Sequence, residues 1–328
     1  MSALKMAAQL DPQAQASSYA GEDVFVAVPS DFRLETGDTL PDVEVRLRRY
    51  GRADGPVVIV SGGISSGRFI AGEGGWWRDH VAPGKAIDLD EYCVFGFDFA
   101  PVEDHRVRLS PRDQARLIAV ALDALGAGVI EAWIGSSYGG SVGLNFAAYA
   151  PARVRRLCVL CAAHKPAALA RGWRGVQRRM VEFAIAQGEV SQGLALARQL
   201  AMITYRSADE FEQRFEDGAL DDQGRSGLDR YLIARGEAYI DAMAPQRWLS
   251  LSESIDRCVV RPEEISPPLT LVACPTDQIA PLEAVEELGR RVQHLTALRT
   301  LPSLYGHDSF LKEPERVGAI LREFLNDD

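Results

Sequence analysis

The stretch Trp133-Ile-Gly-Ser-Ser-Tyr-Gly-Gly140 decides the fold of this chain. It continues an apolar run that begins at Val129, and it contains the pattern Gly-x-Ser-x-Gly centred on Ser137. This pattern is typical of a nucleophile elbow, in which a buried strand turns sharply into a helix and exposes a serine hydroxyl. Gly135 and Gly139 suit the strained turn because neighbouring backbone leaves no room for a Cβ. We therefore predict that Ser137 is a catalytic nucleophile; a plain tight turn is the alternative.

Apolar runs alternate with helical patterns on both sides of this elbow. Such alternation indicates an α/β protein with a mostly parallel sheet that helices cover on both faces. The two earliest strands are expected to be antiparallel. Ser110 and Pro111 are good starting residues for a helix. The expected strands lie at 25–28, 43–47, 56–63, 92–97, 129–134, 156–162, 268–273 and 295–301, and the expected helices, besides the one after the elbow, at 110–126, 282–292 and 314–325.

Between about residues 164 and 261 the pattern is helical throughout. The expected helices cover 176–186, 193–203, 208–215, 229–243 and 247–254. A helical insertion above a sheet is the usual form of a lid that closes over an active site. We therefore predict a core of residues 21–163 and 262–328, a lid of residues 164–261, and a loosely ordered N-terminal tail at residues 1–20.

The composition excludes several classes of function. The chain has 328 residues, of which 47% are hydrophobic, so it can bury one large core. Its net charge of −10 argues against a nucleic-acid partner. We expect no membrane span, no signal peptide and no bound metal or cofactor. Five cysteines, an odd number in a long chain, favour reduced thiols in the cytoplasm, and Cys158 and Cys161 are expected to pack in a strand rather than to bind zinc.

A serine nucleophile needs a histidine base, and the base needs a carboxylate that fixes its tautomer. At an elbow of this kind the chain order is serine, acid, histidine. Asp277 follows an apolar strand, and His307 lies in a glycine-containing loop before the last helix. We predict Ser137, Asp277 and His307 as the triad. A turn or helix-capping role for Asp277 and a solvent-facing role for His307 are the alternatives.

The tetrahedral intermediate of acyl transfer needs backbone N–H groups aimed at its oxyanion. We expect one from Tyr138, directly after the nucleophile, and one from Gly63 or Ile64, where an apolar strand ends in two glycines. The alternative for these glycines is a flexible turn. This set of residues predicts acyl transfer from an ester or a thioester, and leaves open whether water or another alcohol accepts the acyl group.

Several segments resemble the homoserine O-acyltransferase branch of the α/β-hydrolases, the acetyl- or succinyl-transferring enzymes that start methionine synthesis. Gly75-Trp-Trp77 and Gly84–Asp88 are similar to the block after the family's oxyanion loop. Leu194–Ser207 is similar to a lid helix, and Tyr305–Leu311 resembles the histidine loop. The resemblance spans about residues 55 to 325. It implies an α/β-hydrolase fold with an inserted helical lid.

The resemblance also implies how an amino acid is bound. Arg206 would clamp its carboxylate, and Asp308 would bind its ammonium group. A salt bridge within the lid and a loop cap are the alternatives for these two residues. Tyr231 and Arg235 would line the same pocket.

The resemblance implies L-homoserine and acyl-CoA as substrates of a ping-pong reaction, with acyl-CoA as a co-substrate and no bound cofactor. The loop from Asp98 to His105 is shorter and more acidic than in the family. The shorter form looks most like the succinyl-transferring members, so succinyl-CoA is favoured over acetyl-CoA. A succinyl carboxylate needs a cation, and Arg68 or the cluster at 174–179 can supply one; a solvated helix face is the alternative.

Three further readings remain open at this point. Serine can replace homoserine as the acceptor, or the same triad can serve an esterase or thioesterase. A non-catalytic binding protein with this fold is the third. A homodimer formed through the lid is also expected.

Overall fold

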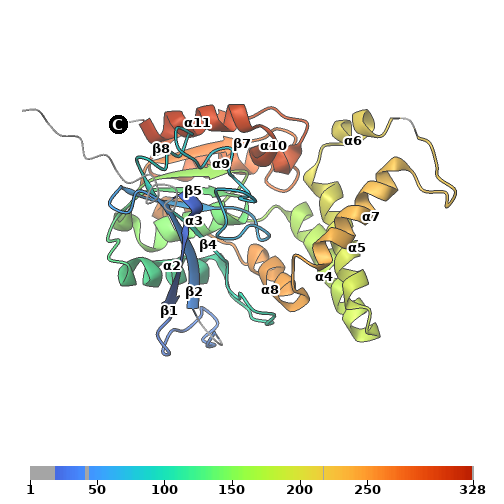
Figure 1. The fold of residues 1–328 in the computed structure, drawn as a ribbon, viewed down its shortest axis with the longest axis horizontal. Coiled ribbons are helices and arrows are strands. Elements are labelled where there is room, and N and C mark those ends of the chain that lie inside the picture. Colours follow the sequence, from blue (N-terminus) through green and yellow to red (C-terminus); the bar gives the residue numbers. More distant parts are fainter. Residues whose placement is uncertain (1–18, 41–43, 217, 327–328) are drawn as a thin grey trace, which may run out of the picture.

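The computed structural model describes residues 19–40, 44–216 and 218–326, and its centre is one eight-stranded sheet (Figure 1). The sheet order is β1-β2-β4-β3-β5-β6-β7-β8. The first two strands pair antiparallel and β3 to β8 are parallel, so the mostly parallel sheet is confirmed. The strands are β1 (Glu22–Ala27), β2 (Glu44–Gly51), β3 (Val57–Ser61), β4 (Cys93–Phe97), β5 (Ile130–Ser136), β6 (Val154–Leu160), β7 (Leu269–Ala273) and β8 (Leu295–Thr300).

Helices cover both faces of this sheet. On one face α2 (Pro111–Ala124), α3 (Tyr138–Tyr149) and α9 (Leu282–Arg291) share an apolar core with the strands. On the other face α11 (Pro314–Asn326) packs with Trp77 and Ile87. Short helical turns are η1 (Pro151–Arg153), η2 (Pro262–Glu264), η3 (Gly306–Asp308) and α10 (Ser309–Lys312).

The predicted start of α2 is seen in the structure. Ser110 and Asp113 form a reciprocal capping box, which satisfies backbone N–H groups that the first turn leaves free. All five cysteines are buried free thiols. The predicted tail lies outside the described residues except for positions 19 and 20, and so does Val43 at the start of the second expected strand.

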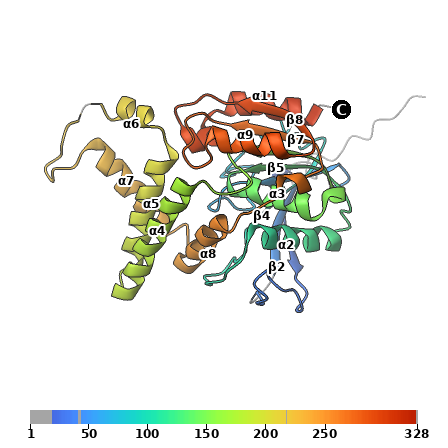
Figure 2. The same cartoon turned by 180° about the vertical axis from the view of Figure 1, so that it is seen from behind.

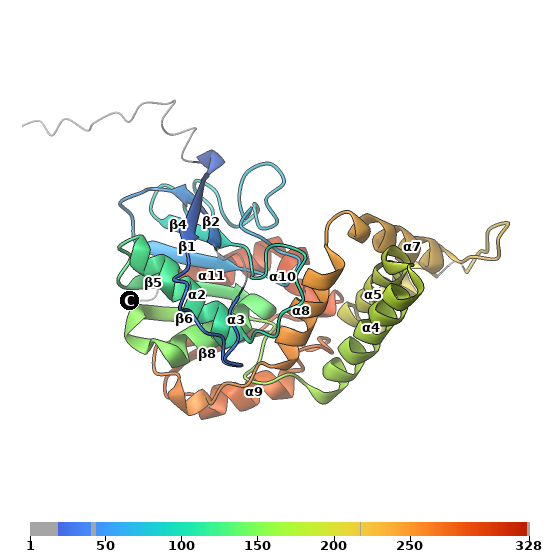
Figure 3. The ribbon, with the colours of Figure 1, turned by 90° about the horizontal axis from the view of Figure 1, so that it is seen from below.

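A helical region is inserted between β6 and β7, as predicted. It contains α4 (Ala168–Gln187), α5 (Val190–Tyr205), α6 (Ala208–Arg214), α7 (Gly227–Ile240) and α8 (Pro245–Asp256). Figures 1 and 2 show α4, α5 and α7 standing away from the sheet, and Figure 3 shows α8 between them and the core. The insertion has a small apolar core of its own, which includes Val181, Leu194, Tyr239 and Trp248. Helix α4 begins eight residues earlier than expected.

None of the helices in the described part of the chain is long and apolar enough to cross a bilayer.

Candidate active site

Ser137 lies at the sharp turn between β5 and α3. Its φ of 52° is in the left-handed region, which a residue with a Cβ rarely adopts. A Cβ on Gly135 would lie 2.5 Å from the carbonyl oxygen of Gly139, and one on Gly139 would lie 2.5 Å from the backbone of Ser61. Both glycines are therefore required by close packing of the backbone, and the turn holds the Ser137 hydroxyl outward.

The sheet brings the predicted triad residues to one edge. Ser61 of β3 is level with Gly135 of β5, and Leu160 of β6 is level with Val272 of β7. Because these strands are parallel, the loops that follow them meet at their carboxyl ends. Those loops carry Gly63, Ser137 and Asp277.

The three side chains form a continuous series of hydrogen bonds. Ser137 Oγ is 2.7 Å from His307 Nε2, and His307 Nδ1 is 2.8 Å from Asp277 Oδ2. The other oxygen of Asp277 accepts hydrogen bonds from the N–H groups of Ile279 and Ala280. These bonds fix the carboxylate, which in turn orients the imidazole so that Nε2 faces the serine.

The electrostatic surroundings favour a basic imidazole. Burial opposes the charged form of His307, but the negative charge of Asp277 and its hydrogen bond outweigh burial and raise the pKa of His307, with a further contribution from Asp308. His307 is thus suited to take a proton from Ser137 and to return it later.

The expected oxyanion donors lie around the same point. Tyr138 is the first residue of α3, and its backbone N–H makes no hydrogen bond within the described part of the chain; the same holds for the N–H of Ile64. Gly63 and Ile64 line a pocket together with Ser137. The N–H of Gly139 donates to the carbonyl of Gly62 at 2.8 Å, which ties the loop after β3 to the elbow.

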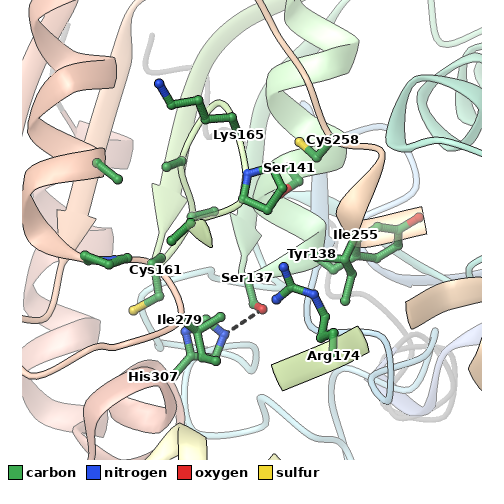
Figure 4. Close-up of a pocket in the computed structure, with 17 residues that line it drawn as sticks. Ser137, Tyr138, Ser141, Cys161, Lys165, Arg174, Ile255, Cys258, Ile279 and His307 are labelled. Atoms are coloured by element: carbon green, nitrogen blue, oxygen red, sulfur yellow. Dashed lines mark hydrogen bonds between the residues drawn. The ribbon is translucent and has the colours of Figure 1, made fainter. Parts of the chain in front are cut away.

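Two pockets meet at Ser137. The larger, of about 790 Å³, lies under the insertion between the loop at 63–66, helices α4 and α5, and the loop at 307–311. The smaller, of about 440 Å³, lies between residues 161–167 and 279–284 (Figure 4). Both are lined by Ser137, Arg174, Ile255, Ile279 and His307. A substrate can therefore extend from the serine in two directions.

Asp308 lines the large pocket, but the structure places Arg206 behind it. Arg206 Nε donates to Asp308 Oδ2 at 2.9 Å, and its Nη1 lies 3.5 Å from Glu210 Oε1. Arg206 is not among the residues that line either pocket. Its guanidinium group is occupied by two carboxylates, which matches the alternative of a salt bridge within the lid.

Tyr231 and Arg235 are not brought to Ser137. Tyr231 packs on Arg214 and Phe215 at the outer end of α7, and the guanidinium carbon of Arg235 lies 5.4 Å from the Tyr231 ring centre. Neither residue lines one of the two pockets at Ser137. The expected shared pocket with Arg206 is therefore not seen in this arrangement.

Arg198 is a pocket residue that the sequence reasoning missed. It lies on α5 and lines the large pocket, with its guanidinium carbon 4.7 Å from the ring centre of Tyr239 and 5.8 Å from that of Tyr205. No carboxylate pairs with it among the described residues. Arg198 lies within α5, and Arg206 is the residue that follows its last turn. The direction of each side chain decides which of the two lines the pocket.

Arg174 is the cation at the junction of the two pockets. It is buried on α4, and Figure 4 shows its guanidinium group directed toward Ser137. Asp256 of α8 accepts one hydrogen bond from Arg174 Nε at one oxygen, and its other oxygen lies 2.7 Å from Arg178 Nη2. Two guanidinium groups share one carboxylate, so this group of three residues has a net charge of +1. Arg68, the other expected cation, instead pairs with Asp23 and Asp98 and lines neither pocket.

A serine, histidine and aspartate in series at such an elbow, on a sheet of this order, define an enzyme class of the α/β-hydrolase fold that transfers acyl groups through serine. The family model described as "alpha/beta hydrolase fold" matches residues 55–314. A homoserine O-succinyltransferase of Xanthomonas campestris is 36% identical over 292 residues, which cover 87% of this chain and 79% of the relative. A homoserine O-acetyltransferase of Nocardia farcinica is 27% identical and covers 90% of each chain. This chain belongs to the homoserine O-acyltransferase family within the α/β-hydrolase fold, and it is an acyltransferase.

Solved structures agree on the fold. A homoserine O-acetyltransferase from Bacillus anthracis superposes with a TM-score of 0.84 at 15% identity, covering 94% of this chain and 98% of its own. Esterase E22 superposes equally well, with a TM-score of 0.84 at 17% identity over 93% of this chain and all of its own. Transferases and esterases thus share this architecture, so the two activities have to be distinguished by the active-site residues and not by the fold.

Proposed function

We propose that Ser137 carries an acyl group from acyl-CoA to L-homoserine, the first step of methionine biosynthesis in this branch. The observation that supports this most is the pair of hydrogen bonds, 2.7 and 2.8 Å long, that link Ser137, His307 and Asp277. His307 takes the proton of Ser137, whose oxygen attacks the thioester carbon. The N–H groups of Tyr138 and of Gly63 or Ile64 stabilise the oxyanion. The carbon–sulfur bond breaks, and His307 protonates the CoA thiolate.

The second half of the reaction reverses these roles. His307 removes the proton of the homoserine hydroxyl, whose oxygen attacks the acyl-enzyme carbon. The bond to Ser137 breaks, and the serine oxygen regains its proton from His307. The product is the O-acyl ester of homoserine. Water has to be excluded while the acyl-enzyme exists, and the helical insertion over the large pocket offers the means.

The charges around the large pocket support an amino acid as the acceptor. Homoserine carries one carboxylate and one ammonium group. Arg198 is proposed to bind the carboxylate and Asp308 the ammonium group, since one oxygen of Asp308 is free of partners among the described residues. Arg206 then holds Asp308 in place through the other oxygen.

The cation shared by both pockets, Arg174, supports succinyl-CoA as the preferred donor. Arg198 and Asp308 account for the charges of homoserine, which leaves the net positive charge of Arg174, Arg178 and Asp256 without a counterpart. A succinyl group supplies a further carboxylate, and an acetyl group does not. The Xanthomonas relative, named a homoserine O-succinyltransferase, is 36% identical, while the Nocardia relative, named an acetyltransferase, is 27% identical.

A homodimer is proposed to form through the insertion. Several large apolar side chains are exposed on the outer surfaces of α4 and α5: Leu169, Phe183, Leu196 and Ile203. A second copy would cover them.

We place the reaction in the cytoplasm, because all five thiols are free.

Release of free CoA tests the proposal. Succinyl-CoA and acetyl-CoA are each incubated with L-homoserine, L-serine or buffer. Turnover that requires homoserine and is faster with succinyl-CoA is the expected result. Release that is equal in buffer alone identifies a thioesterase, and a requirement for serine changes the acceptor. Ser137→Ala is expected to lose turnover with every pair, and an active Ser137→Ala enzyme would contradict the mechanism.

A further inference from the structure

Gln177 is a largely buried residue in the large pocket, and its side-chain amide has no hydrogen-bond partner among the described residues. The residue is 4% exposed, lies on α4 and lines the large pocket together with Ser137. Neither its carbonyl oxygen nor its NH₂ group makes a hydrogen bond to any described residue of the chain. The amide atoms are not fully enclosed, so they are open to the pocket, where a ligand can supply the hydrogen bonds that the chain does not.

The neighbours of Gln177 place it in a continuous face of the helix. Ala170, Trp173, Arg174 and Gln177 are spaced by three, one and three residues, so they project from one side of α4, and all four line the large pocket. Gln177 follows Arg174 by three residues, a rise of about 4.5 Å along the helix. Arg174 borders Ser137, and Gln177 therefore lies about one helical turn further from the point where the two pockets meet.

The chemistry of the amide indicates what it binds. A glutamine side chain offers one acceptor and two donors without charge, which matches a neutral secondary amide better than a carboxylate. The charged groups of homoserine and of a succinyl group are already matched by Arg198, Asp308 and Arg174. The pantetheine arm of CoA has a secondary amide two methylene groups beyond its sulfur.

The shared role of His307 in both half-reactions places the pantetheine arm in the large pocket. His307 protonates the departing thiolate and later deprotonates the incoming hydroxyl, so the thiol and homoserine occupy the same side of Ser137 in turn. Asp308 and Arg198, the proposed homoserine contacts, line the large pocket and not the small one. The acyl chain is then directed toward the small pocket, and the arm passes Gln177.

We propose that Gln177 is the residue that binds the first amide of the pantetheine arm, while the half-buried indole of Trp173 packs against the arm. The inference rests on the proposed function, because it takes Ser137 as the point where the thioester is cleaved. It assigns the recognition of the CoA moiety to α4 of the insertion rather than to the core.

Two small thioesters test this assignment. One carries the acyl group on N-acetylcysteamine, which retains the amide, and the other carries it on pentanethiol, in which methylenes replace the amide atoms. The acyl group is the one that the CoA-release assay favours. The wild-type protein is expected to react about tenfold faster with the amide donor, as kcat/KM for thiol release, because one hydrogen bond is gained and the glutamine is no longer left unpaired.

Gln177→Met is expected to bring the ratio of the two rates close to one, because the amide donor loses its hydrogen bond and the pentyl thioester no longer leaves a glutamine unpaired. Gln187→Met is the matched control, since Gln187 is exposed at the end of the same helix, and it should retain the tenfold ratio. If the Met variant does not fold, Gln177→Glu retains the shape but loses the N–H donors, and should also lower the ratio.

Two results with the Gln177 variants would overturn the assignment. The first is an equal loss with both thioesters, which would mean that Gln177 only shapes the pocket. The second is a raised KM for homoserine with the donor ratio intact, which would place Gln177 at the acceptor. A wild-type protein that cleaves acyl-CoA but does not distinguish the thioesters contradicts this inference alone. A wild-type protein that releases no CoA contradicts the proposed function.

Discussion

Arg174 and Arg178 provide a comparison at the scale of single residues. Both lie on α4 and both contact Asp256, but only Arg174 lines the pockets at Ser137. Arg174→Met is expected to lower kcat/KM for succinyl-CoA by about 10- to 100-fold, the range for loss of a hydrogen bond to a charged group. The rate with acetyl-CoA should change much less.

Arg178→Met is the control for that measurement. It leaves Asp256 paired with Arg174 and should preserve the preference for succinyl-CoA. Equal losses with both donors in the Arg174→Met enzyme would refute a role in donor selection and would leave Arg174 as a structural partner of Asp256.

Side-chain direction is what the sequence could not supply at this scale. The order of Ser137, Asp277 and His307 was readable because each follows a recognisable strand or loop, and the structure brings them within hydrogen-bonding distance. Arg198 and Arg206 are eight residues apart, the first in the middle of α5 and the second at its C-terminal end. Their roles depend on which one faces the pocket and which one meets Asp308, and tertiary packing decides that.

Helix α8 shows the same limit at the scale of an element. Its helical character was predicted, but the role of the short acidic loop after Phe99 was not. In the structure Asp104 of that loop accepts hydrogen bonds from the N–H groups of Gln246 and Arg247, in the first turn of α8. Ser250 bonds the loop backbone at His105 and Val107. The loop thus holds α8 against the core. Contacts of this kind, between segments far apart in the chain, leave no periodic pattern in the sequence from which they could be predicted.

Asp104→Ala is expected to destabilise the protein by about 1 kcal/mol, because two N–H groups at the start of α8 lose their acceptor. Urea denaturation followed by circular dichroism measures the change. Asp104→Asn keeps an acceptor oxygen at the same place and should restore most of the stability. If the Ala variant is as stable as the wild type, the loop does not hold α8 in the way described.

The start of helix α4 was predicted eight residues too late. The segment from 168 to 175 contains Gly172, Gly175 and two arginines, which weaken an apolar helical pattern. Arg174 of this segment is buried and faces the pockets, so a polar residue stands where the hydrophobic period expects an apolar one. Predicting a helix from its hydrophobic period fails where polar side chains occupy buried positions of the helix.

At the scale of the whole molecule, the insertion leaves an apolar surface exposed. Phe183 of α4 is 69% exposed and Leu196 of α5 is 47% exposed. A Phe183→Asp, Leu196→Asp double variant is expected to convert a dimer into a monomer, as measured by light scattering, because charges would be buried at the contact.

Leu220→Asp is the control for this variant. Leu220 is also exposed, at 66%, but lies in the segment between α6 and α7. It should leave the dimer intact. A wild-type protein that is monomeric at micromolar concentration would rule out the proposed assembly.

The separate apolar core of the insertion has a consequence for how the family can diversify. Substitutions on α4 alter side chains that face the pockets, while Ser137, Asp277 and His307 depend on the sheet and its loops. If Arg174 selects the donor as proposed, a lineage can change its acyl donor through a few substitutions in one helix without altering the residues that cleave the thioester. Relatives named homoserine O-succinyltransferase and homoserine O-acetyltransferase both occur, and the proposal predicts that they differ at the α4 positions that face the pockets.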